Sequence, residues 1–334
     1  MKGREENEAI VENRISVMIF AKPQILQDYA NNGFINKSYT TKKVYVEYVI
    51  DFLNYLETNH IINSFNIKDY NKIEMKHIEN YAQTLKQSRN KDKRNKEGIQ
   101  ASRLYAIFHF FKFLYSRSVI TSNPSIGITV PKVREEIEVI SLTGEEVSVI
   151  KENILKGVGS KKAIEAQKKW KNRDLALLQL GLTTGLRVTA MSEINIEDID
   201  FENKVIRVTD KGNVTKNSYI GDQTIEVLKL WIKDREKILG EEQINALFIS
   251  NQKKRISTKA ISYVLTKYTQ NIDKHITPHK LRSSCATNLY AVNGGDIYEV
   301  GEVLGHKNLS NTKRYTKVSE EKRKSAASRL DNIF

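Results

Sequence analysis

The residues best suited to chemistry are basic side chains and one tyrosine in the second half of the chain. They comprise an isolated arginine, a lysine within a turn, a histidine and an arginine three residues apart, and a histidine nine residues before a tyrosine. The six residues are Arg187, Lys211, His279, Arg282, His306 and Tyr315. Because residues three apart on a helix share a face, His279 and Arg282 can point at one target.

Such a set suits attack on a phosphodiester. The transition state carries extra negative charge, which fixed arginine and histidine donors can neutralise without a metal ion. A guanidinium donates in a planar fork and stays charged. A tyrosine hydroxyl can act as a covalent nucleophile, and a lysine in a turn can protonate the leaving oxygen. The set therefore predicts phosphoryl transfer with no metal and no cofactor.

Other signatures of nucleotide or metal chemistry are absent from the sequence. It has no GxxxxGK[ST] phosphate loop, no GxGxxG after a predicted strand, no HExxH and no GxSxG. One acidic cluster could bind Mg²⁺ in a nuclease: Glu193, Glu197, Asp198 and Asp200. No histidine lies beside it and it leads into a predicted strand. We therefore interpret this cluster as a solvated turn.

The charge of the chain favours a polyanionic partner. Its 334 residues include 54 Lys and Arg against 40 Asp and Glu, a net charge of +14. Such an excess is typical of nucleic-acid-binding proteins, although a generally lysine-rich composition is the alternative. Residues 71–134 hold 13 basic and 4 acidic residues. The densest run predicts a DNA-binding loop formed by Lys86, Arg89, Lys91, Lys93, Arg94 and Lys96. A solvated loop is the alternative.

The length of the chain suggests two domains. No apolar run approaches the ~18–20 residues that a membrane span needs, and the charged N-terminus lacks a signal-peptide core. The single cysteine, Cys285, excludes an intramolecular disulfide and a cysteine-based zinc cluster. We expect a cytoplasmic protein with no membrane segment.

The first 134 residues are predicted to form a helical domain. Apolar residues recur at helical spacing over 43–57, 74–86 and 99–117. An earlier helix is expected within 7–30, interrupted by Pro23. The aromatic stripe over 108–115 could stack on bases, but its helical spacing favours a place in the core.

The segment 121–137 contains prolines and a glycine and predicts a linker. Beyond it, Thr143 and Glu146 form a capping box for a helix over 144–156. Further helices are expected over 172–182, 223–238 and 257–271, and mostly helical chain from residue 277 onwards. Alternating residues predict strands over 198–209 and 216–220, joined by the turn that holds Lys211, and a third short strand over 246–250.

In this order and with these flanks, the six residues resemble the tyrosine recombinase/integrase family, and most of all its compact two-domain Xer-type members. Arg187 lies in TTGLR, Lys211 in DKGN, His279 and Arg282 in HKLR, and His306 in LGH, with Tyr315 nine residues later. The resemblance is strong over about 140–320. Over about 38–134 it rests on the helix pattern and the closing phrase FFKFLYSRSVITSNPS.

The resemblance implies a two-domain DNA clamp. An α-helical core-binding domain would span 38–134, with a linker over about 121–140. A mixed α/β catalytic domain, mainly helical with a small antiparallel sheet, would span 141–334 and end in a tail helix. The resemblance does not reach residues 1–37, which we expect to form an N-terminal, helical extension. Family members act on double-stranded DNA as homotetramers that bring two sites together, with a dimer on each site, through a Holliday junction.

The resemblance also implies site-specific recombination through a 3′-phosphotyrosyl intermediate. Tyr315 would attack the scissile phosphate, and Arg187 and Arg282 would hold its non-bridging oxygens. Arg187 could instead be a structural partner of Asp174. Because the bond energy stays in the protein–DNA link, no ATP is needed.

The remaining roles fall on two histidines and a lysine. His279 would act in proton transfer with the tyrosine, and His306 would donate a hydrogen bond to the phosphate. Lys211 would protonate the leaving 5′ oxygen, with Lys204 and Lys216 as nearby alternatives.

Two positions depart from the family pattern. The acidic residue that often follows the first arginine by three positions is Ala190, which leaves Glu193 one turn later as a candidate substitute. The usual histidine after the second arginine is Ser283. Neither change removes a reacting group. A non-catalytic DNA-binding relative and a type IB topoisomerase-like enzyme are the alternative functions. The sequence leaves open whether the reaction serves chromosome dimer resolution or the integration and excision of a mobile element.

Overall fold

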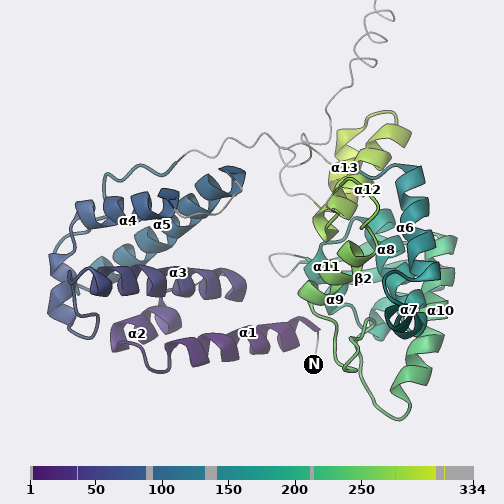
Figure 1. Cartoon of the computed structure of the whole chain (residues 1–334), viewed down its shortest axis with the longest axis horizontal. Coiled ribbons are helices and arrows are strands. Elements are labelled where there is room, and N and C mark those ends of the chain that lie inside the picture. Colours follow the sequence, from purple (N-terminus) through teal and green to yellow (C-terminus); the bar gives the residue numbers. More distant parts are fainter. Residues whose placement is uncertain are drawn as a thin grey trace, which may run out of the picture. The chain divides into compact units, whose positions relative to one another are not determined.

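The computed structural model describes residues 3–35, 37–87, 93–131, 141–210, 214–274 and 276–305, and residue 312. The chain divides into two compact units (Figure 1). The helical unit comprises Glu5–Glu136, and the C-terminal unit comprises Ile137–Phe334 with Met1–Arg4. Each unit has its own hydrophobic core.

The helices of the first half are α1 (Gly3–Ile19), α2 (Gln24–Asn32), α3 (Tyr39–Thr58), the 3-10 helix η1 (Ile67–Lys72), α4 (Met75–Gln87) and α5 (Lys93–Ser116). The helices predicted from apolar spacing correspond to α3, α4 and α5. Pro23 separates α1 from α2 because it has no N–H to continue a helix, and it serves as the N-cap of α2. The Ser38 hydroxyl accepts from the Thr41 amide and starts α3.

The core of the helical unit is rich in aromatic side chains. Phe110 and Phe111 of the predicted stripe are fully buried, whereas Tyr115 is exposed. Residues of the segment 1–37 contribute to the same core, among them Leu26 and Tyr29 of α2. The buried residues of this segment therefore share the core of the helical unit, and α2 contacts α3.

The C-terminal unit is mostly helical, with one small sheet. Its helices are α6 (Gly144–Lys156), α7 (Lys161–Lys168), α8 (Lys171–Thr184), α9 (Val188–Glu193), the 3-10 helix η2 (Ile196–Asp198), α10 (Asp222–Leu239), α11 (Thr258–Lys267), α12 (Pro278–Val292) and α13 (Ile297–Leu304). The buried helix α8 packs against α10 and α12. The predicted capping box of α6 is present.

The sheet consists of β1 (Ile199–Asp200), β2 (Val205–Asp210) and β3 (Val214–Tyr219), in the order β1-β2-β3 and antiparallel throughout. This composition of helices with a small antiparallel sheet confirms the predicted fold class. Within the described ranges, no helix is long and apolar enough to cross a membrane.

Several elements differ from expectation. The strand predicted over 198–209 is divided into β1 and β2, and α9 had no predicted counterpart. Residues 246–250 form isolated bridges, Asn195 with Ala246 and Ile249 with Arg255, and no strand. Their apolar side chains are buried, which a strand prediction based on hydrophobicity cannot distinguish from a buried irregular segment. Helix α7 had no predicted counterpart, because its short, polar sequence has no continuous apolar face.

Candidate active site

Arg187 emerges from a tight turn between two helices. Helix α8 ends at Thr184, and Gly185 follows in the left-handed conformation with φ 58° and ψ 22°. A Cβ at Gly185 would lie 2.5 Å from Leu304 Cδ2 and 3.2 Å from Cys285 Sγ. Glycine therefore relieves both the backbone strain and the crowding. Arg187 is half-buried and is the N-cap of α9.

The same arrangement recurs before His306. Helix α13 ends at Leu304, and Gly305 follows in the left-handed conformation with φ 66° and ψ 47°. The residue after it is His306, which lies outside the described residues, as do Lys211 and Tyr315. Two of the predicted site residues thus directly follow helix ends that terminate on a left-handed glycine.

Arg282 joins these two helix ends. Its side chain is buried, with 4% of the residue exposed. Nη1 donates to the Gly185 carbonyl at 2.6 Å, and Nη2 donates to the Leu304 carbonyl at 2.8 Å. Carbonyls at a helix C-terminus lack intrahelical donors and carry partial negative charge, so a guanidinium satisfies both requirements. Arg282 therefore holds the chain two residues before Arg187 and two residues before His306.

His279 lies on the helix that carries Arg282. Thr277 is the N-cap of α12 and Pro278 its first residue, so His279 falls in the first turn, where it is exposed. Ser283, which stands where the family often has a histidine, donates to the His279 carbonyl at 3.1 Å. Burial raises the pKa of the Cys285 thiol to about 11, so this side chain packs as a neutral group.

Helix α9 is fixed at its far end by an arginine that the sequence did not single out. Arg255 Nη1 donates to the carbonyls of Ser192 and Ile194 at 3.1 and 3.3 Å. Ala190 is buried in the core of the unit, and Glu193 is the last residue of α9. Arg255 stands at the end of a run of basic residues with no helical or strand pattern, so no sequence signal separates it from solvated lysines.

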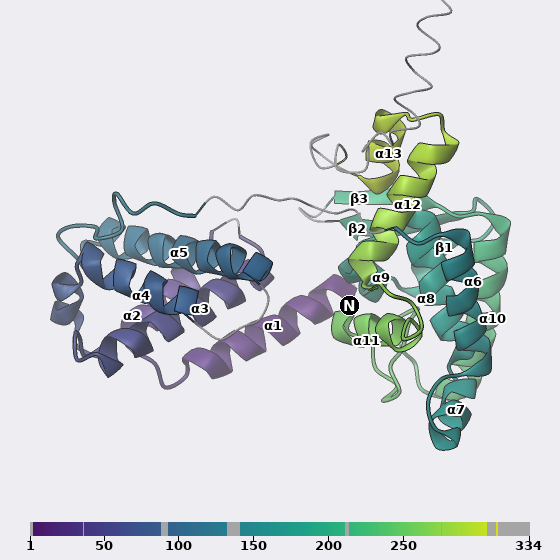
Figure 2. The ribbon, with the colours of Figure 1, turned by 45° about the horizontal axis from the view of Figure 1, so that its top comes forward.

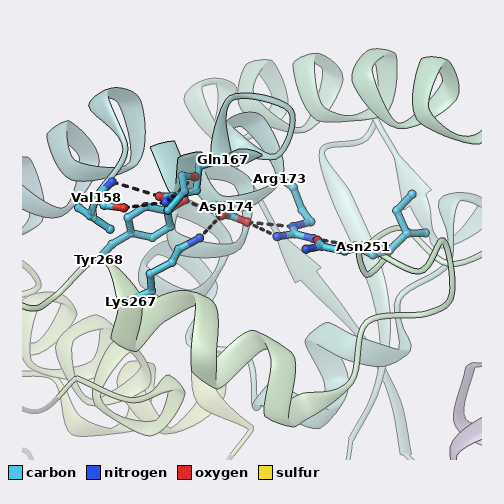
Figure 3. A network of polar contacts seen from close by, with 9 residues as sticks. Val158, Gln167, Arg173, Asp174, Asn251, Lys267 and Tyr268 are labelled. Carbon is cyan, nitrogen blue, oxygen red and sulfur yellow. Dashed lines mark hydrogen bonds and ion pairs between the residues drawn. The ribbon is translucent and has the colours of Figure 1, made fainter. Parts of the chain in front are cut away.

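A buried acid lies at the start of α8, the helix that leads to Arg187 (Figure 3). Asp174, which is 0% exposed, accepts from Arg173 Nε at 2.8 Å and from the Tyr268 hydroxyl at 2.8 Å, and pairs with Lys267 Nζ at 3.4 Å. Burial raises the pKa of Tyr268 and lowers that of Lys267.

Asp174 is not the structural partner of Arg187. Asp174 lies in the first turn of α8 and Arg187 follows the C-terminus of this 14-residue helix. At 1.5 Å per residue, Asp174 lies about 15 Å along the helix axis from Thr184, the last residue of α8. The side-chain partners of Asp174 are Arg173, Lys267 and Tyr268. Figure 3 also shows Gln167, which bonds both backbone groups of Val158 and closes the turn before α7.

Two residues of the acidic cluster, Asp198 and Asp200, accept hydrogen bonds within local turns. Asp198 accepts from the Asn195 amide, and Asp200 accepts from the amide and the side chain of Asn203. Among the residues that the structure describes, no group of three or more His, Cys, Asp or Glu side chains could hold a metal ion.

The two alternative lysines have different surroundings. Lys204 pairs with Asp222 at 2.7 Å, and Lys216 Nζ donates to the Val303 carbonyl at 3.3 Å. In the predicted DNA-binding loop, Arg89 and Lys91 lie outside the described residues, and so do the side chains of Lys86, Lys93, Arg94 and Lys96.

Residues 148–322 match the model of the phage integrase family. The chain belongs to this family. The recombinase is 30% identical to tyrosine recombinase XerC of Actinobacillus pleuropneumoniae serotype 7 over 228 aligned residues. This alignment covers 66% of this chain and 70% of that one. It is 29% identical over 287 residues to XerC of Mannheimia succiniciproducens, covering 80% and 92%.

Solved structures share the fold of the recombinase. XerH bound to palindromic difH substrate in a post-cleavage complex has a TM-score of 0.64 at 20% identity, covering 88% of this chain and 80% of that one. The Tn1549 transposon integrase in complex with circular intermediate DNA has a TM-score of 0.62 at 19% identity, covering 91% and 99%.

These comparisons confirm the predicted family and enzyme class. The protein is a site-specific tyrosine recombinase, an enzyme that cleaves and rejoins DNA through a tyrosine intermediate. They favour this function over the non-catalytic and topoisomerase-like alternatives.

Proposed function

We propose that Tyr315 is the nucleophile of this recombinase. Its hydroxyl oxygen attacks the scissile phosphorus, the bond from phosphorus to the 5′ oxygen breaks, and a 3′-phosphotyrosyl link forms. His279 takes part in moving the tyrosine proton, and Lys211 gives a proton to the leaving 5′ oxygen. Rejoining is the reverse attack by a 5′-hydroxyl, so no ATP is consumed.

The phosphate is held by the remaining predicted residues. Arg187 and Arg282 contact the non-bridging oxygens, and His306 donates a hydrogen bond in the transition state. One observation carries this assignment: the buried guanidinium of Arg282 binds the backbone two residues before Arg187 and two residues before His306. Three separate sequence motifs therefore converge on a single side chain.

The substrate is a double-stranded recombination site in the cytoplasm. The two units clamp the duplex, a dimer occupies each site, and a tetramer joins two sites through a Holliday junction. The structural neighbours include a lambda integrase dimer bound to a COC′ core site. Chromosome dimer resolution and movement of a mobile element both use this reaction, and a transposon or phage cassette beside the gene would identify the second.

Covalent trapping tests the nucleophile. A duplex site is first selected from random DNA by binding and then nicked next to the cleavage position, so that the released fragment diffuses away. The wild type should accumulate a denaturant-resistant adduct in the presence of EDTA, and the adduct peptide should contain residue 315. Tyr315→Phe removes only the hydroxyl, so DNA binding should persist while the adduct disappears.

Other outcomes redirect the assignment. An adduct with Tyr315→Phe would mean that another tyrosine is the nucleophile. Binding without any adduct from the wild type would indicate a non-catalytic relative. Relaxation of supercoiled DNA without joining of two sites would indicate a topoisomerase-like enzyme.

We also propose that the loop of Lys86, Arg89, Lys91, Lys93, Arg94 and Lys96 contacts DNA phosphates. Its charge density supports this. Replacing Lys91, Lys93, Arg94 and Lys96 by glutamine should weaken binding to all sequences alike. It should also flatten the slope of log affinity against log salt by up to ~0.9 for each phosphate that is no longer neutralised. An unchanged slope would identify a solvated loop.

A further inference from the structure

Lys216 occupies an unusual position on the small sheet. It lies opposite Val208 in the antiparallel register of β2 and β3. Opposite residues point to the same face of a sheet, and Val208 is buried. Lys216 is half-buried, and its bond to a main-chain carbonyl is exposed. A long lysine side chain on such a face can cover apolar surface with its stem while its ammonium group stays close to water.

The partner is the end of α13. Lys216 Nζ donates to the Val303 carbonyl at 3.3 Å, so β3 meets the end of α13; both elements are labelled in Figure 2. The next carbonyl along the chain, that of Leu304, accepts from Arg282. Two cations from different elements, β3 and α12, thus bind consecutive carbonyls at the C-terminus of α13, where positive charge is most favourable.

These contacts join two elements that lead, along the chain, into predicted site residues. The β2–β3 hairpin leads directly into the turn that holds Lys211, five residues before Lys216. The end of α13 leads through Gly305 into His306 and on to Tyr315. Through this bond Lys216 ties the hairpin to the end of this helix.

We propose that Lys216 is a positioning residue, which couples the hairpin of the proton donor to the segment of His306 and the nucleophile. The proposal rests on the proposed function. In this proposal Lys211 gives the proton to the leaving oxygen, and Lys216 acts through its bond to the Val303 carbonyl. It keeps the leaving oxygen and the attacking oxygen on opposite sides of one phosphate.

First-turnover cleavage tests the proposal with two substrates. One is ordinary nicked DNA, and the other has a bridging 5′ sulfur at the scissile phosphate, a leaving group that needs no proton donor. Lys216→Met keeps the aliphatic stem and removes the donor. It should slow adduct formation about tenfold on both substrates, which is the effect of one charged hydrogen bond.

Three variants serve as comparisons. Lys211→Met should form the adduct slowly on ordinary DNA and at a restored rate on the substrate with the bridging 5′ sulfur. Lys216→Arg should retain most activity, because its fork still reaches the carbonyl. Lys204→Met removes the same charge from the same hairpin but breaks a pair with Asp222, so its rate should match the wild type.

A measurement without DNA separates this inference from the proposed function. Hydrogen exchange of the amides at the end of α13 should accelerate in Lys216→Met and stay unchanged in Lys204→Met, at equal melting temperature. If the substrate with the bridging 5′ sulfur restores the rate of adduct formation in Lys216→Met, Lys216 is a proton donor and the proposal is overturned. If Lys216→Met cleaves DNA and exchanges amide hydrogens at the same rates as the wild type, the proposal is also overturned. Lys216 would then serve only to prevent another strand from pairing with the edge of the sheet. Absence of any adduct from the wild type would instead refute the proposed function.

Discussion

The helical unit and the C-terminal unit hold their chains together by different means. In the helical unit many of the large, fully buried side chains are aromatic, among them Tyr29, Phe52 and Phe110, and aromatic rings contact one another. In the C-terminal unit, three buried arginines donate to backbone carbonyls: Arg173 to Ile249, Arg235 to Ala246 and Ile244, and Arg282 to Gly185 and Leu304.

The difference follows from what each unit must position. A bundle of helices satisfies its own backbone and needs only apolar surface to bury. The candidate site instead lies on short helices and turns, whose carbonyls lack regular partners. A planar guanidinium can bind two such carbonyls at once, so it fixes irregular chain where an aromatic ring cannot. Substitutions in the two units should therefore differ in their effects on cleavage and on stability.

The largest effect is expected from Arg282→Lys. An ammonium group cannot bridge the Gly185 and Leu304 carbonyls, so one helix end is left unpaired. Adduct formation should fall by on the order of 10²–10³, and the C-terminal unit should lose about 1–3 kcal/mol of unfolding free energy. Both tryptophans, Trp170 and Trp231, lie in that unit, so tryptophan fluorescence in urea measures its stability selectively.

Arg187→Lys is the matched control, because Arg187 is only half-buried. It should lose cleavage with a smaller change in the urea midpoint. Equal midpoints for the wild type and Arg282→Lys would show that the bonds to the two carbonyls contribute nothing to the fold.

The next effect concerns the buried acid of α8. Asp174→Asn keeps the shape of the side chain but leaves the buried Arg173 without a charged partner. The C-terminal unit should lose about 3 kcal/mol of unfolding free energy, the usual cost of breaking a buried ion pair. Glu152→Gln breaks the exposed pair with Lys156 and should change stability by less than about 1 kcal/mol. Similar urea midpoints for these two variants would contradict the role given to burial.

The smallest effect is a pH dependence confined to the helical unit. Burial, together with Lys37 and Lys112, lowers the pKa of His109, whose ring stacks on Phe34 and bonds the Tyr29 hydroxyl. The unfolded chain therefore binds this proton at higher pH than the folded chain. Stability should fall as the pH drops below about 6.5.

Circular dichroism in urea at pH 7.5 and 5.5 measures this loss, with tryptophan fluorescence separating the C-terminal unit. His109→Gln should reduce the pH dependence. Some should remain, because burial and Lys76 also lower the pKa of His77. The same slope in the wild type and in His109→Gln would exclude His109 as its source.

Local sequence was sufficient for much of the fold. Apolar spacing predicted α3, α4 and α5 because a helix that buries one face must repeat its apolar residues every three to four positions. The capping box predicted the start of α6 because its bonds form between residues three apart. By contrast, residues 246–250 and α7 were missed or misassigned, because their structure depends on what covers them.

The identity of the candidate site residues was likewise a property of the sequence, since six residue types in order define the family resemblance. The contacts that hold these residues in place could not be predicted from the sequence. That Arg282 would bind carbonyls 97 and 22 residues away, that Arg255 would fix α9, and that Lys216 would reach α13 depend on which helix ends meet in space. Spacing along the chain encodes contacts within one element, whereas contacts between elements depend on tertiary packing, in which α12 contacts both α8 and α13.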